Sequence, residues 1–81
     1  MQPGAGARLS GGEARAAKKE LTRIERRTEK LRAEEGRLHT ALAGAATDHE
    51  QVLALDAELR AVVAEREGLE DEWLEVAASL E

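Results

Sequence analysis

Apolar residues recur along this chain in steps of three and four residues, within two segments that a short break separates. The first segment, from Ala14 to Leu42, has seven apolar residues at nine positions of the repeat, and the second, from Val52 to Leu80, has eight of nine. A repeat of this kind that lasts four heptads keeps a narrow apolar stripe, here called the seam, on one side of a helix, where one partner helix covers it. Each segment is therefore predicted to be one helix of a coiled coil.

The break between the two segments, Gly44 to Thr47, is only long enough to reverse the chain. The sequence therefore predicts an all-α protein, a two-helix antiparallel coiled-coil hairpin. The expected parts are a flexible N-terminal segment over residues 1–9, a hairpin over residues 10–81, helices over about residues 11–43 and 48–80, and a turn over about residues 44–47.

Capping patterns stand at the expected helix ends. Ser10 and Glu13 have the spacing of a capping box, and Thr47 and Glu50 repeat it before the second helix. Gly44 is placed to adopt the left-handed conformation that often follows a last helical turn. The stretch around Ser10 also looks like the phosphate-binding signature motif of ABC ATPases, but the chain has no Walker A loop, so a helix cap is the prediction.

Charge is divided unequally between the two segments. Residues 8–37 carry ten basic and six acidic side chains, residues 38–81 carry two and eleven, and the net charge is -5. One predicted helix is therefore basic and the other acidic, which is typical of two helices that pair with each other. The favoured register has three opposed pairs in the seam, which are Leu31 with Leu59, Leu21 with Leu69 and Ala17 with Trp73. It has three flanking ion pairs, against two meetings of like charge; the ion pairs are Lys18 with Glu70, Arg32 with Asp56 and Arg27 with Glu65.

The chain lacks the residues of an active site or a metal site. It has no cysteine, and His39 and His49, ten residues apart, match no zinc-binding spacing. Its acidic clusters are typical of solvated helix faces and not of acid/base catalysis. We therefore expect no enzymatic activity, no metal and no cofactor in this chain.

The compartment and the oligomeric state follow from similar arguments. No apolar run reaches the ~18 residues of a membrane span, and the first twelve residues have no hydrophobic region of the secretory kind. These features predict a cytoplasmic protein without membrane contact. Because each seam has its partner within the same chain, we also expect a monomer.

A stripe of basic residues is predicted on the outer side of the first helix, away from the seam. Its members are Lys19, Arg23, Arg26, Lys30 and Arg37, with Arg27 at its edge. Such a stripe suits the phosphates of a nucleic acid. With Trp73 as the sole aromatic residue, base stacking is not expected, so binding would be weak and independent of sequence. An ordinary solvated helix face is the alternative.

Several short motifs along the chain form a set, which is Arg8-Leu9-Ser10, Lys18-Lys19-Glu20-Leu21, Ile24-Glu25, the arm from Leu38 to Leu42, Asp56-Ala57-Glu58-Leu59 and Glu72-Trp73-Leu74-Glu75. Over about residues 8–80 they resemble the C-terminal coiled-coil domain of ABC-F ATPases, particularly the Uup-like members. The resemblance implies a parent protein with two ATPase domains in cis, which use ATP and Mg, and action at the ribosome. It further implies an accessory hairpin that contacts DNA or ribosomal RNA. A structural or protein-docking coiled coil without nucleic-acid binding is the alternative.

Overall fold

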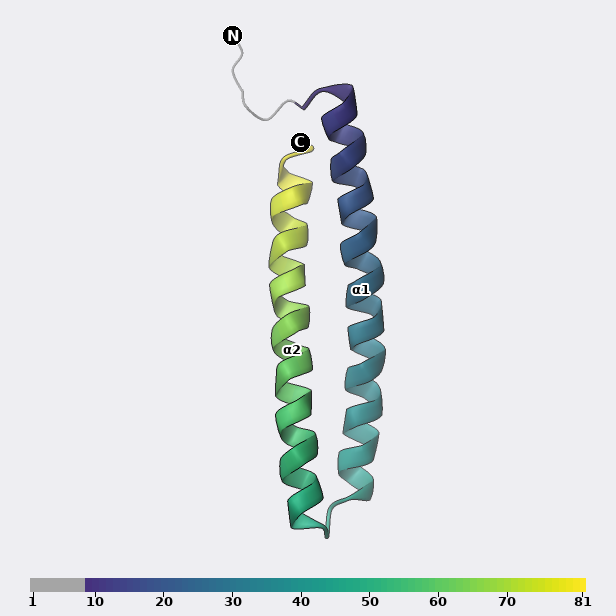
Figure 1. Cartoon of the computed structure of the whole chain (residues 1–81), viewed down its shortest axis with the longest axis vertical. Coiled ribbons are helices and arrows are strands. Elements are labelled where there is room, and N and C mark those ends of the chain that lie inside the picture. Colours follow the sequence, from purple (N-terminus) through teal and green to yellow (C-terminus); the bar gives the residue numbers. More distant parts are fainter. Residues whose placement is uncertain (1–8) are drawn as a thin grey trace.

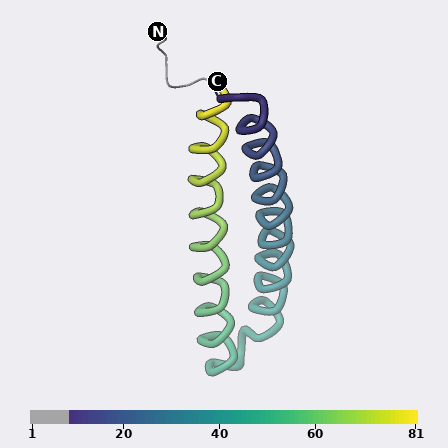
Figure 2. Tube along the Cα trace, turned by 45° about the horizontal axis from the view of Figure 1, so that its top comes forward, coloured from purple at the N-terminus to yellow at the C-terminus, as the bar shows by residue number. Residues whose placement is uncertain are grey.

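The protein is an antiparallel hairpin of two long helices, as predicted. The structure, a computed structural model, describes residues 9–81 and contains α1 (Gly11–Gly44) and α2 (His49–Ala78). The two helices run side by side in opposite directions, so that Gly11 and Ala78 lie at the same end of the hairpin (Figures 1 and 2). At about 1.5 Å per residue, α1 is about 50 Å long. The predicted flexibility of residues 1–9 concerns positions that, except for Leu9, lie outside the described residues.

A capping box starts α1, as the sequence predicted. The Ser10 hydroxyl accepts a hydrogen bond from the Glu13 amide at 3.1 Å, and the Glu13 carboxylate accepts one from the Ser10 amide at 2.9 Å. Two amide groups that would otherwise lack a partner in the first turn are satisfied in this way. The helix therefore begins at a fixed residue.

This cap makes the first turn of α1 sensitive to pH. The bond from the Ser10 amide, helped by the Ser10 side chain, lowers the pKa of Glu13 below its ordinary value of 4.5. Because the pKa is lower in the folded chain, the cap stabilises the helix above the ordinary pKa, and this stabilisation is lost as the pH falls through the lowered pKa. We expect the exchange of the Ser10 and Glu13 amide hydrogens to accelerate in that range beyond the normal pH trend. In Glu13→Gln, which keeps an acceptor but does not titrate, the extra change should vanish; an identical profile in both chains would contradict the cap.

The turn differs from the prediction at both of its ends. Asp48, and not Thr47, caps α2, because the Asp48 carboxylate accepts a hydrogen bond from the Gln51 amide at 3.1 Å. Gly44 is the last residue of α1, and no described residue has a positive φ, so the predicted left-handed glycine is wrong. Ala45 ends the helix with an ordinary φ of -100° and is itself buried. A buried alanine, and not a flexible glycine, thus fixes the turn.

The core is a single line of side chains along α1. Ile24 is 0% exposed, and the other buried apolar residues, Leu31, Leu38 and Ala45, follow at intervals of seven residues. α2 has no buried residue, and the members of its seam are half-buried. Because a seam between only two helices is covered from one side, the heptad repeat of apolar residues implies a shallow core of this kind. Among the described residues, no helix is long and apolar enough to cross a membrane.

The two helices meet in a register other than the predicted one. The Trp73 indole donates a hydrogen bond to the Glu25 carboxylate at 2.9 Å, whereas the prediction placed Trp73 opposite Ala17. The Arg27–Glu65 ion pair forms as predicted, at 2.8 Å. Because Glu25 lies eight residues beyond Ala17, α2 is shifted along α1 by about one heptad.

The flanking ion pairs change with this shift. Arg32 binds Glu70 at 2.5 Å instead of Asp56, and Asp56 binds Arg60 of its own helix at 2.8 Å. These pairs are exposed at the edge of the seam, where each contributes at most ~1 kcal/mol. Several registers allow ion pairs of this strength to form, so these pairs do not select one register.

Two charges inside the seam give the physical reason for the observed register. Glu35 and Arg66 occupy seam positions, their side chains are only 16% and 17% exposed, and they bind each other. Arg66 also donates to Glu70 at 3.1 Å, and hydrogen bonding to Glu35 raises the pKa of its guanidinium. A charge taken out of water is costly unless it is paired. In the predicted register both charges would have faced apolar residues, Leu55 and Ile24.

Candidate functional site

The six basic residues singled out from the sequence all lie on α1 and are all exposed. Positions three, four or seven residues apart on a helix share one side of it. The five members of the predicted stripe therefore follow one line, with Arg27 beside it, over about 27 Å between Lys19 and Arg37. We call this surface of α1, with the same six residues, the basic face.

Three residues of the basic face are held by carboxylates. Arg23 binds Glu20 at 2.6 Å and Glu72 of α2 at 3.4 Å, Arg27 binds Glu65 of α2, and Arg37 binds Glu34. Hydrogen bonding with Arg23 lowers the pKa of Glu20, and the same contact raises the pKa of Arg23. These arginines are occupied in the hairpin, and of their pairs the sequence predicted only that of Arg27 with Glu65.

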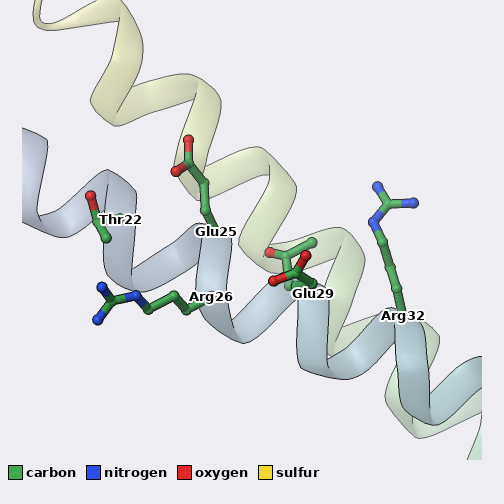
Figure 3. A pocket seen from close by; sticks show the side chains of 6 residues that line it. Thr22, Glu25, Arg26, Glu29 and Arg32 are labelled. Carbon is green, nitrogen blue, oxygen red and sulfur yellow. The ribbon is translucent and has the colours of Figure 1, made fainter.

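The other three, Lys19, Arg26 and Lys30, form no ion pair with any residue that the structure describes. Figure 3 shows Arg26 extending along α1 toward the turn that carries Thr22, whereas Glu25 and Arg32 extend in another direction. Because the intervals between the three residues are seven and four, their charges follow a line of about 16 Å along the helix. These three side chains are available to an anion without breaking a contact.

One further cation belongs with them and was missed. Arg15 is exposed, forms no ion pair within residues 9–81, and precedes Lys19 by four residues, which is about one turn of the helix. The four-residue interval was the signal that could have identified it. Lys18 is also exposed and lacks the predicted partner Glu70, which binds Arg32 and Arg66 instead.

Two shallow depressions border the basic face, and both have lining residues of mixed charge. One, of about 500 Å³, is lined by Thr22, Glu25, Arg26, Thr28, Glu29 and Arg32 (Figure 3). The other, of about 410 Å³ between the helices, includes Arg27, Lys30 and Arg37 together with Glu34 and Glu65. Acidic neighbours at both places oppose a small anionic ligand held in a pocket, and favour contact along the open face of α1. Within the described residues, no group of three acidic, histidine or cysteine side chains could hold a metal ion.

Comparison with known proteins places this hairpin in a family. The family model described as the ABC transporter C-terminal domain matches residues 12–78, which include nearly all of both helices. No curated protein and no solved structure matches the chain. The matched helical hairpin is an accessory domain of ABC proteins and does not have the fold of an ATPase domain. The chain therefore belongs to the ABC transporter C-terminal domain family.

Proposed function

We propose that this hairpin is the non-catalytic C-terminal accessory domain of a cytoplasmic ABC-F ATPase of the Uup-like type, and that it contacts nucleic acid through the basic face. The observation that carries the proposal is the line of unpaired cations Lys19, Arg26 and Lys30 on a chain whose net charge is -5. ATP and Mg would be bound by the ATPase domains of the parent protein. The nucleic acid would be DNA or the RNA of the ribosome.

The acidic character of α2 does not cancel this surface. The axes of packed helices are about 8 to 10 Å apart, and charges separated by more than the ~8 Å Debye length of physiological salt are largely screened from each other. The outward side of α1 is farther still from the acids of α2. A phosphate at Arg26 therefore interacts mainly with groups of α1, whereas a phosphate at Lys30 also lies near Glu65 of α2, which lines the same depression.

The expected binding is weak, independent of sequence and steeply dependent on salt. If Arg15, Lys19, Arg26 and Lys30 each neutralise one phosphate, the logarithm of the binding constant should fall with the logarithm of the salt concentration with a slope of about -3 to -4 on duplex DNA. No side chain of this face is aromatic, so no base is read by stacking.

The test compares two variants that lower the net charge by the same amount. Arg26→Gln with Lys30→Gln removes two of the free cations, whereas Arg60→Glu makes the same change of charge on α2. In fluorescence anisotropy titrations with duplex DNA and with ribosomal RNA fragments, the first variant should lose about half of the salt slope, because two phosphate contacts are removed. The second variant should bind almost as the original chain does.

Two results would contradict the proposal. One is no binding to either nucleic acid at low salt, and the other is an equal loss of affinity in both variants, which would mean that only net charge matters. The alternative, a protein-docking coiled coil, would then stand. It is favoured by two exposed leucines on α2, Leu53 and Leu74, and therefore concerns the opposite helix.

A further inference from the structure

The side of α2 that faces away from α1 has a second apolar pattern. Leu53 and Leu74 are 58% and 61% exposed, although both are large hydrophobic residues. Their separation is three heptads, so they lie on the same side of the helix, about 31 Å apart. α1 lies along one side of α2 (Figure 1), and the exposure of both leucines shows that α1 does not cover them.

The positions between the two leucines on this side of the helix, taken in steps of four and three residues, hold two alanines and three charged residues. In order they are Leu53, Ala57, Arg60, Ala64, Glu67, Asp71 and Leu74. We call this set the outer stripe. Steps of this kind are the period of a coiled-coil seam, so α2 presents one stripe to α1 and a second stripe to solvent.

The two leucines and one pair of charges in the outer stripe are self-complementary, whereas Asp71 has no basic counterpart in it. The midpoint between Leu53 and Leu74 coincides with the midpoint between Arg60 and Glu67. When a second copy of α2 lies antiparallel on the first, each Leu53 meets Leu74 of the other copy, and each Arg60 meets Glu67. A two-fold axis repeats every such contact, which is the arrangement of a closed dimer.

The side chains of the outer stripe are available for these contacts. Glu67 is exposed and forms no ion pair within the described part of the chain, and the Arg60 side chain is 81% exposed although it also binds Asp56. Ala57 and Ala64 stand between the larger residues and are exposed. Small side chains at the contact let two helices approach to about 8 Å, a distance at which the flanking leucines and charges reach each other.

We propose that the occupant of the outer stripe is a second copy of this chain, joined through an antiparallel α2–α2 contact into a four-helix dimer with the α1 helices outside. One face of one helix is smaller than the ~800 Å² per partner of a stable interface, so the dimer is weak. We expect a dissociation constant on the order of 100 μM. At low micromolar concentration such a weak dimer would dissociate, so the sequence-based expectation of a monomer remains a prediction for that range.

The experiment is sedimentation equilibrium of the 81-residue chain over a range from ~10 μM to ~1 mM. The average mass should rise from that of a monomer toward that of a dimer. Arg60→Glu and Glu67→Arg each place like charges opposite one another twice per dimer, and each should weaken association by about tenfold or more. The double variant restores both pairs and should recover the original association.

Arg37→Glu serves as the control, because Arg37 is equally charged and exposed but lies on α1. It should not change the association. A monomer mass that persists to the highest concentration overturns the proposal, as does a double variant that stays as weak as the single ones. Binding of nucleic acid uses the opposite side of the hairpin, so either proposal can fail without the other.

Discussion

The variant Ile24→Ala is expected to be largely unfolded at room temperature. Ile24 is the one side chain that is 0% exposed among the described residues, and it is the first member of the core line, which continues with Leu31 and Leu38. Truncating a buried isoleucine to alanine costs about 2 to 5 kcal/mol. A single core in a chain of this size rarely supplies more than ~3 to 5 kcal/mol of net stability. The expected loss is thus comparable to the whole free energy of unfolding of the chain.

The measurement is far-ultraviolet circular dichroism at low micromolar concentration, with urea unfolding of the original chain for reference. Leu53→Ala is the matched control, because it also removes a large aliphatic side chain but from a position that is 58% exposed. A surface change of this kind should alter stability by less than about 0.5 kcal/mol. Equal loss of helix in both variants would show that the hairpin is not held by the Ile24 line.

Reversing a single charge inside the seam is expected to have the second largest effect. In Arg66→Glu, two carboxylates would share the seam position that Glu35 and Arg66 now occupy, and Glu70 would be a third acidic neighbour. Water would screen their repulsion poorly at side chains that are less than one-fifth exposed, and the nearby Arg32 is already bound to Glu70. We expect the midpoint of thermal unfolding to fall by about 10 °C or more.

The double variant, Glu35→Arg with Arg66→Glu, tests whether the pair itself matters. It restores opposite charges in the same place and should recover most of the lost stability, although Glu70 then faces a carboxylate. The control is Arg32→Glu, which reverses a flanking residue whose side chain is 62% exposed. This variant should change the midpoint of thermal unfolding only slightly. If Arg32→Glu is as harmful as Arg66→Glu, the register is set by the flanking charges and our explanation is wrong.

The register is also where the sequence-based prediction failed, and these two residues explain why. The repeat identified both helices and the core residues Ile24, Leu31 and Leu38, because burial follows directly from a heptad period. The flanking charges were then used to align the helices, although each contributes little. The two charges that interrupt the seam, which cannot remain unpaired, were the stronger constraint.

The sequence predicted the candidate site only in part, as it did the fold. Spacing alone identified six exposed basic residues of α1 but not Arg15. The pair of Arg27 with Glu65 was predicted, but Arg23 could not be recognised as occupied, because it finds Glu72 on α2 only in the observed register. Likewise, Thr47 and Asp48 are both good cap residues, and only the three-dimensional turn decides that Asp48 accepts the amide.

The ion pairs that join the helices have a consequence for any anion that reaches α1. Glu65 accepts from two nitrogens of Arg27, and Glu20 and Glu72 share one nitrogen of Arg23, so a phosphate would meet these carboxylates at the same guanidinium groups. The carboxylates of the hairpin therefore compete with a phosphate for part of the basic face. If nucleic acid binds as proposed, contact would begin at Lys19, Arg26 and Lys30, and a phosphate that displaced Glu72 from Arg23 or Glu65 from Arg27 would loosen the hold of α2 on α1. Tight occupancy of these two arginines and tight closure of the hairpin would then oppose each other.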